Sequence, residues 1–195
     1  DDFDKAKSAY QAKDFIQAFA GYEKAAMEGH EQAQFYLGYM YDKGRGVEQD
    51  YSSAALWFEK AAKQGNAAAQ FNLALLHENG LGVKQSYAEA LYWYMAAAKQ
   101  DHDNAIFNLA NMYANGRGVN LNHSKAIFWY KKAAKQGYAI AKFNVANIYF
   151  YAEDETQDIE KALKWYQDAA KQGNYLAKEK LRRIKAEYDE KPRQL

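Results

Sequence analysis

Ala133-Ala134-Lys135-Gln136-Gly137 decides the fold of this chain, because the same five residues return in register elsewhere. They also end at Gly65 and Gly173, and the copy that falls between ends in Asp101 instead of glycine. Each step is 36 residues long, and one further step back reaches Gly29 in a related stretch. A fixed period of this length is typical of stacked structural repeats. Such an array devotes its residues to stacking, so we expect its function to lie on a surface rather than in an enclosed pocket.

Two helices joined by a glycine turn are predicted for each repeat, as residues 67–102 illustrate. Gly80 and Gly82 supply left-handed backbone positions that end the first helix, here called helix A. Ser86 and Glu89 form a capping-box pattern in which both side chains satisfy free amides, so helix B is expected to begin at the serine. Stripes at helical spacing are formed by Ala69, Leu73, Ala74 and His77 in helix A and by Ala90, Tyr94, Ala97 and Ala98 in helix B.

The other repeats keep these features in three columns of equivalent positions. The caps are Asp50, Ser86, Asn122 and Asp158, the glycine pairs are Gly44/Gly46, Gly80/Gly82 and Gly116/Gly118, and the aromatic pairs are Trp57/Phe58, Trp93/Tyr94, Trp129/Tyr130 and Trp165/Tyr166. Tryptophan and tyrosine bury a large area and carry a polar group, so the tryptophan column is expected to hold adjacent repeats together. The alternative is a platform for stacking bases or sugars, which requires exposed rings.

The run Ala69-Gln70-Phe71-Asn72-Leu73-Ala74, the Gly-x-Gly-Val turn and the segments 125–130 and 132–137 together resemble the Sel1-like (Sel-one-like) repeat, or SLR. This is a longer-turn relative of the tetratricopeptide repeat, and the match covers residues 31–174 as four repeats. The resemblance implies an all-α fold, a right-handed α-solenoid superhelix of antiparallel helix pairs whose A helices line a concave groove. Members of this family typically act as adaptors or scaffolds in protein complexes, in bacteria often outside the cytoplasm.

Domain organisation follows from the repeat, because no linker interrupts it and the only proline, Pro192, lies near the end. We expect a single repeat domain over 1–195, with SLR repeats at 31–66, 67–102, 103–138 and 139–174. Residues 1–30 lack the glycine turn and have Gly21 in the tryptophan column, so they predict a tetratricopeptide-like capping repeat. Residues 175–195 predict a capping helix and tail. Polar outer faces on such caps keep an array soluble.

The candidate binding site consists of helix A positions that grip peptides in the related tetratricopeptide domains. Three columns align there: Phe35, Phe71, Phe107 and Phe143; Tyr36, Asn72, Asn108 and Asn144; and Tyr39, Leu75, Asn111 and Asn147. Asparagine offers donors and acceptors together, which suits the backbone of an extended peptide. The same side chains could instead serve packing and hydrogen bonds between repeats. These columns contain no basic group, so the expected ligand is a neutral or mixed segment, and an acidic tail is disfavoured.

Composition excludes several classes of function. The net charge of +1, with mixed signs, gives no basic surface for general nucleic acid binding. Cysteine is absent, which excludes disulfides, thiolate metal sites and cysteine nucleophiles. No apolar run reaches the ~20 residues that a membrane-spanning helix needs. The chain begins at Asp1 rather than methionine, which weakly favours a periplasmic or secreted bacterial protein over a cytoplasmic one. A monomer is expected, with association through the stacking ends as the alternative.

No catalytic pattern is found, so we expect no enzyme activity, no cofactor and no metal. The four histidines form no metal-binding pair, and His30 and His102 share one position between repeats, which suggests a structural role. No serine is followed three residues later by lysine, as a penicillin-binding motif requires. The alternative function is a cell-envelope carbohydrate or peptidoglycan binder or modifier. In the last repeat Ala152 and Asp154 replace the turn glycines, and Glu153, Asp154, Glu155 and Asp158 make the loop acidic. This loop is interpreted as solvated, as a contact for a basic partner, or as a weak calcium site.

Overall fold

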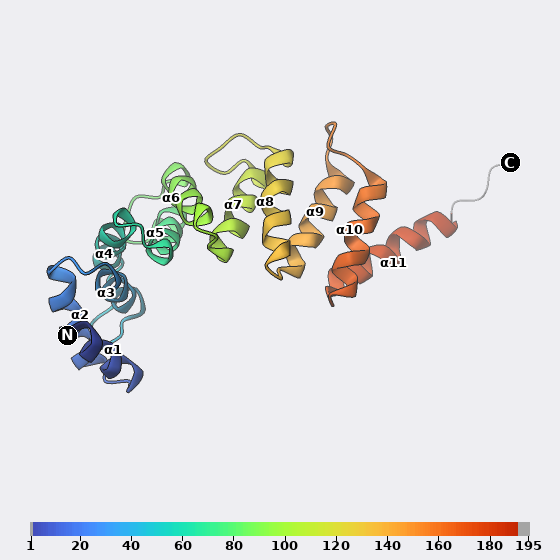
Figure 1. Ribbon diagram of the computed structural model, residues 1–195. Coiled ribbons are helices and arrows are strands. Elements are labelled where there is room, and N and C mark those ends of the chain that lie inside the picture. The colour runs from blue at the N-terminus through green and yellow to red at the C-terminus, as the bar shows by residue number, and fades with distance from the viewer. Residues whose placement is uncertain (1, 191–195) are drawn as a thin grey trace. The chain divides into compact units, whose positions relative to one another are not determined.

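The computed structural model describes residues 2–190, with side chains up to Glu187, and this part of the chain contains eleven α-helices and no strand (Figure 1). The helices are α1 (Asp2–Gln11), α2 (Phe15–Met27), α3 (Glu31–Lys43), α4 (Tyr51–Lys63), α5 (Ala67–Asn79), α6 (Tyr87–Lys99), α7 (Asp103–Asn115), α8 (His123–Lys135), α9 (Ala139–Tyr151), α10 (Ile159–Lys171) and α11 (Tyr175–Glu190). The all-α helical-repeat fold is therefore confirmed. No helix in the described part of the chain is both long and apolar enough to cross a membrane.

The chain forms two compact units, Asp1–Ala105 (unit 1) and Ile106–Leu195 (unit 2). The boundary lies inside α7, so most of that helix belongs to unit 2. In unit 1 the hairpins α1/α2, α3/α4 and α5/α6 pack side by side, with α2 against α3 and α4 against α5. Each unit is a stack of helix pairs, as the repeat predicts. Its extent as one domain over 1–195 stays a prediction.

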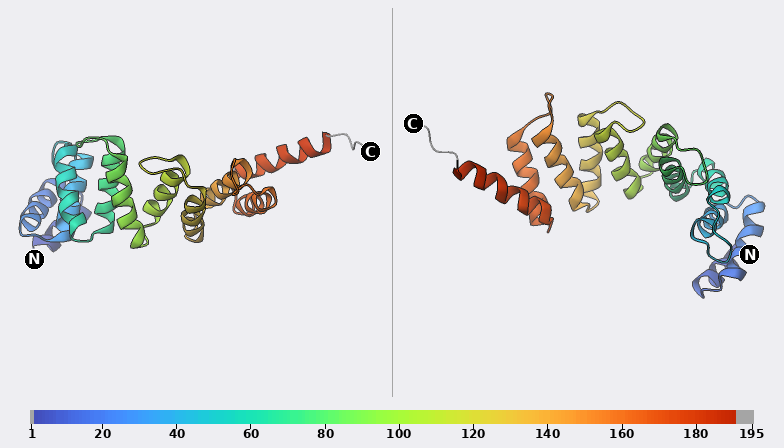
Figure 2. Two further views of the ribbon diagram at one scale, coloured as in Figure 1. Left: turned by 90° about the horizontal axis from the view of Figure 1, so that it is seen from above. Right: turned by 180° about the vertical axis from the view of Figure 1, so that it is seen from behind.

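In unit 2, α8, α9, α10 and α11 each pack against the next (Figure 2). Its core includes Leu109, Met112 and Val145, all almost fully buried. The last helix, α11, packs on α10 and buries Ala177 and Ile184. The role of this helix as a cap stays a prediction.

The turn between helices A and B is closed by a backbone hydrogen bond that the capping-box prediction missed. Ser86 Oγ accepts from the amide of Glu89 at 3.2 Å, so the serine cap is confirmed. The reciprocal half is wrong, because the Ser86 amide donates to the carbonyl of His77 at 2.9 Å rather than to Glu89. The three equivalent caps do the same: Asp50 to Tyr41, Asn122 to Tyr113 and Asp158 to Tyr149. The base of each turn is thus tied to the preceding helix A.

The second turn glycine is required by a close approach to the previous repeat. Gly82 has a φ of +67°, and a Cβ there would lie 2.2 Å from the carbonyl carbon of Tyr51, at the start of α4. Gly46 meets the carbonyl oxygen of Phe15 in the same way, at 2.1 Å. Any other residue would displace the backbone of the neighbouring repeat, since real Cβ atoms essentially never come this close. The glycine column therefore fixes the contact between successive repeats.

The glutamine of the repeated Ala-Ala-Lys-Gln-Gly stretch links one repeat to the next. Gln100 Nε2 donates to the carbonyl of Gly65 at 2.8 Å and to Gln70 Oε1 at 2.9 Å. Gln70 is buried and in turn donates to the carbonyl of Ala62 at 3.1 Å. Gln64 and Gln34 repeat this relay one step earlier. Buried amides must be paired, so the relay accounts for the glutamines at positions 64 and 100. It does not account for Gln136 and Gln172, because the partner position holds Ile106 and Lys142 in the later repeats.

In the aromatic pairs on helix B, the second residue is buried more deeply than the tryptophan that was expected to hold the repeats together. The second members are almost fully buried, namely Phe58, Tyr94, Tyr130 and Tyr166. Trp93 is buried to 9% exposure, whereas Trp57, Trp129 and Trp165 are half-buried. Trp57 still packs against the core formed by residues 3–40, which supports its contact role between repeats. The deepest packing therefore belongs to the residue that follows each tryptophan.

Candidate functional site

The predicted site residues of unit 1 are occupied by packing and local hydrogen bonds. Phe71 is half-buried, with its ring centroid 5.9 Å from Tyr94 and stacked 4.8 Å from His102. Asn72 Nδ2 donates to the carbonyl of Ala68, one turn back in the same helix, at 2.8 Å. Phe35 likewise packs 6.0 Å from Phe58. Tyr39 and Leu75 are half-buried.

His102 also acts as the N-cap of α7, which explains the shared position with His30. Its Nδ1 accepts from the amide of Ala105 at 3.3 Å, and His30 Nδ1 accepts from Ala33 at 3.2 Å. Burial lowers the pKa of His102, and the neighbouring Asp103 opposes this effect. An accepting Nδ1 requires the neutral ring, so both the burial and the cap favour that form.

In unit 2 the phenylalanine column again serves packing. Phe107 lies 5.7 Å from Tyr130 and stacks 5.7 Å from Tyr138, which occupies the position of His102 in the next repeat. Phe143 lies 5.7 Å from Tyr166. The rings are half-buried between helix A and helix B rather than displayed on the surface. Aromatic contacts at these distances stabilise the pair beyond the buried area alone.

The asparagine column of unit 2 satisfies buried tyrosine hydroxyls. Tyr130 donates to Asn111 Oδ1 at 2.5 Å, and Tyr166 donates to Asn147 Oδ1 at 2.7 Å. Burial raises the pKa of Tyr130 to about 12, and a hydrogen bond from Asn144 acts in the opposite direction. The amide oxygens of Asn111 and Asn147 therefore serve the core, as the packing reading expects. Their role in binding a partner stays a prediction.

These asparagines line a cavity of about 390 Å³ in unit 2. Its walls are formed by Asn111, Ala114, Asn115, His123, Tyr130, Asn144, Asn147, Ile148, Tyr151 and Ala152. The structure thus brings together three of the predicted site residues, Asn111, Asn144 and Asn147. It leaves Phe107, Asn108 and Phe143 outside the walls of this cavity. This cavity, with the ten wall residues just given, is called the amide cavity below.

The acidic loop borders the amide cavity at Ala152, and its carboxylates Asp154 and Asp158 bind different partners. Asp154 accepts from Thr156 and from His123 Nδ1, each at 2.8 Å. Hydrogen bonds from Thr156 and then from His123 lower the pKa of Asp154 to about 2. Asp158 caps α10 and pairs with Lys161. Within residues 2–187 no group of three histidine or carboxylate side chains is arranged to hold a metal ion, so the geometry does not support the calcium reading.

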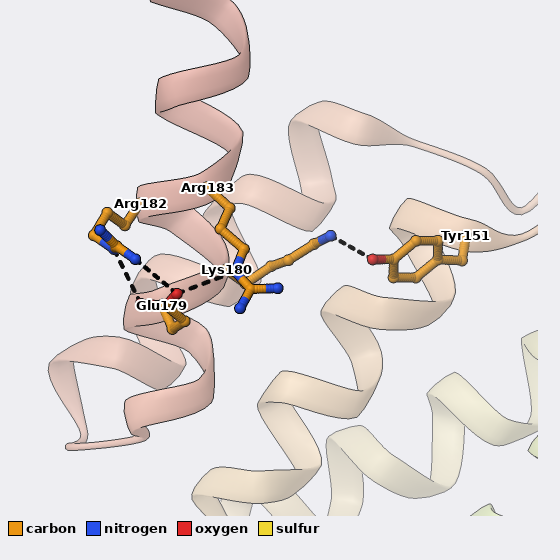
Figure 3. Close-up of polar contacts among 5 residues, drawn as sticks. All are labelled: Tyr151, Glu179, Lys180, Arg182 and Arg183. Atoms are coloured by element: carbon orange, nitrogen blue, oxygen red, sulfur yellow. Dashed lines mark hydrogen bonds and ion pairs between the residues drawn. The ribbon is translucent and has the colours of Figure 1, made fainter.

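The sequence columns continue onto α11, which supplies basic residues that the prediction missed. One period after Phe143, Asn144 and Asn147 stand Glu179, Lys180 and Arg183. Figure 3 shows Lys180 reaching from α11 to the hydroxyl of Tyr151, to which its ammonium donates. The absence of basic groups therefore holds only for columns that stop at Asn147. The signal was available, because counting one further step of 36 residues reaches all three positions.

Comparisons with known proteins agree with this architecture. The family model of the Sel1 repeat matches residues 8–30, 31–66, 67–102, 103–138 and 139–174. The first of these segments lies in the stretch expected to be a tetratricopeptide-like cap. No curated protein matches the chain.

Two of the solved structures that are similar to this chain share about a third of its aligned residues. A Sel1 repeat protein from Oxalobacter formigenes is 34% identical, with a TM-score of 0.80, over 88% of this chain and 71% of that protein. A protective antigen of uropathogenic Escherichia coli strains, which displays an SLR fold, is 35% identical, with a TM-score of 0.76. That match covers 83% of this chain but only 35% of the antigen. With five matched repeats and a relative at this identity, the chain belongs to the Sel1 repeat family.

Proposed function

We propose that the chain is a non-enzymatic interaction scaffold that binds a segment or surface of a partner protein at the amide cavity of unit 2. Sel1 repeat proteins are generally protein-interaction scaffolds, which supports the class of function. The observation that carries the site is the set of three asparagines around one open cavity, two of them anchored by buried tyrosines. Anchored amides present donors to an extended backbone without first losing side-chain freedom.

The carbohydrate or peptidoglycan alternative has less support from the tryptophan column. Lys60 Nζ lies 3.9 Å over the ring of Trp57, and Lys132 Nζ lies 5.5 Å from the ring centroid of Trp129. A lysine over the ring occupies the face on which a sugar would stack. We therefore favour a protein partner.

Site-specific photocrosslinking tests the proposal. A photoreactive phenylalanine analogue at Asn115, an exposed wall residue of the amide cavity, is expected to form a covalent adduct with the partner in extracts of the source cells. The same analogue at Lys164, exposed on helix B of unit 2, is the matched control. An adduct that forms equally at both positions, or only at Lys164, would contradict the proposed face.

A further inference from the structure

The amides of Asn111 and Asn147 have a fixed orientation. Tyr166 is almost fully buried, so its hydroxyl proton needs an acceptor, and Asn147 Oδ1 supplies it. If the Asn147 amide were flipped, its NH₂ group would face the hydroxyl proton of Tyr166, and two donors would meet. The oxygen of Asn147 therefore points toward Tyr166 and the core. The same argument holds for Tyr130 and Asn111. Both Nδ2 groups are therefore left as donors at the amide cavity, and neither donates to another described residue.

Lys180 adds a positive charge beside these donors. Its ammonium lies 4.6 Å from the ring centroid of Phe150 and 4.7 Å from that of Tyr151, and it donates to the Tyr151 hydroxyl (Figure 3). Among the described residues no carboxylate lies within ion-pair distance of it. The hydroxyl oxygen of Tyr151 accepts from Lys180, so the proton of Tyr151, a wall residue, remains available as a further donor.

Two acidic groups at this end of unit 2, Glu179 and Asp154, already accept donors of their own. Glu179 accepts from Arg182 at 2.9 Å and from Arg183 at 3.0 Å. Asp154 accepts from Thr156 and His123. Asn147, Tyr151 and Lys180 therefore contribute donors and one positive charge to this end of the amide cavity. The complementary ligand carries acceptors and negative charge, and a carboxylate combines both.

We propose that the amide cavity binds an extended acidic segment of the partner, with an aspartate or glutamate side chain received by Asn147, Tyr151 and Lys180. Asn111 then serves a backbone carbonyl of the same segment. This inference rests on the proposed function and revises the neutral or mixed ligand expected from the shorter columns. It commits to side-chain carboxylates rather than to a free chain terminus.

Nuclear magnetic resonance titration of the full chain tests it with two capped peptides of alternating glycine, one with glutamate and one with glutamine. We expect the glutamate peptide to shift the side-chain amide signals of Asn111 and Asn147 in a saturable manner. Lys180→Gln retains most of the side chain but removes the charge, and is expected to weaken binding at least about tenfold, the loss typical of a charge-assisted hydrogen bond. Lys185→Gln, exposed on α11, changes the net charge equally and should bind like the parent.

Four results would overturn the inference. Three are equal binding of both capped peptides, equal effects of Lys180→Gln and Lys185→Gln, and no saturable shift. The fourth concerns a third peptide, the glutamine peptide with an uncapped C-terminus: binding of this peptide alone would show that a chain terminus is recognised instead of a side chain. Far-ultraviolet circular dichroism establishes that each variant is folded. If both peptides bind equally at the amide cavity, the acidic preference fails while the proposed function stands. If the photocrosslink at Asn115 fails, the proposed function itself fails.

Discussion

Tyr22 and Tyr166 occupy the same column of helix B but differ in whether the buried hydroxyl has a hydrogen-bond partner. Tyr166 donates to Asn147, whereas the buried hydroxyl of Tyr22 has no hydrogen-bond partner among the described residues. The position that supplies Asn147 in the later repeat is Phe3 in the first, which offers no acceptor. An unsatisfied buried hydroxyl destabilises the fold, whereas a satisfied one stabilises it modestly.

Removing these two hydroxyls should therefore have different effects on stability. Tyr166→Phe is expected to lower the free energy of unfolding by about 0.5–1.5 kcal/mol, the net value of one hydrogen bond. Tyr22→Phe should leave it unchanged or raise it, because nothing is lost except an unpaired polar group. Urea denaturation of the two variants measures both. Equal losses would show that Tyr22 is satisfied by water or another group.

At the scale of the element, the N-cap of α7 makes one helix sensitive to pH. His102 caps α7 as the neutral ring, and burial lowers its pKa from the ordinary 6.5. The unfolded chain therefore binds more protons than the folded chain over the range between the lowered and the ordinary value. The stability that this cap gives the folded chain is fully present above pH 6.5, the ordinary pKa of histidine, and is lost as the pH falls through the lowered pKa of His102.

His102→Asn should remove this pH dependence while keeping the cap. Asn66 and Asn174 occupy the equivalent position and cap α5 and α11 through their side-chain oxygens, at 2.8 and 2.9 Å. Between about pH 7.5 and about pH 5, the parent should lose more of its free energy of unfolding than the variant does. Thermal unfolding at both pH values tests this. Parallel losses in the two proteins would exclude His102 as the titrating group.

The glutamine relay is the element that couples successive helix pairs. Gln70→Ala and Gln100→Ala each remove a donor or acceptor from the same chain of hydrogen bonds. We expect each to cost about 1–3 kcal/mol, the range for leaving a buried partner unsatisfied. The double variant should cost less than the sum, with a coupling of at least about 0.5 kcal/mol in a double-mutant cycle. Additive losses would mean that the two amides act independently.

For the whole molecule, cohesion comes from buried packing rather than from ion pairs. The pairs Lys63–Glu59, Lys161–Asp158 and Arg183–Glu179 join residues within one helix or its cap and are exposed. The pairs Lys24–Asp2 and His123–Asp154 do join different elements, but each has at least one exposed partner. Exposed pairs contribute little and are screened by salt. Raising sodium chloride from about 0.05 M to about 0.5 M should change the free energy of unfolding by less than about 1 kcal/mol. A larger loss would indicate an electrostatic contribution between the repeats.

The sequence predicts most of this fold because caps and turns depend on local chemistry. The columns of Ser86 and Gly80 can be assigned from neighbouring residues alone, and the structure bears them out. The acceptor of the Ser86 amide is not predictable in this way, since it lies on the preceding helix. Asn147 is ambiguous for another reason, because the same amide can serve a core hydroxyl and a ligand. Lys180 was predictable from the period but fell beyond the last complete repeat.

The bond that closes each turn also determines where this architecture accepts new sequence. In the repeat 139–174 both turn glycines are replaced, yet the Asp158 amide still donates to the carbonyl of Tyr149 at 2.8 Å. The two helices are therefore joined at the base of the loop whatever residues form its tip. Insertions between Ala152 and Gln157 would lengthen the tip while leaving that junction in place. We therefore expect this loop to accept grafted sequence, so that the array could carry a new epitope while its helices keep their packing.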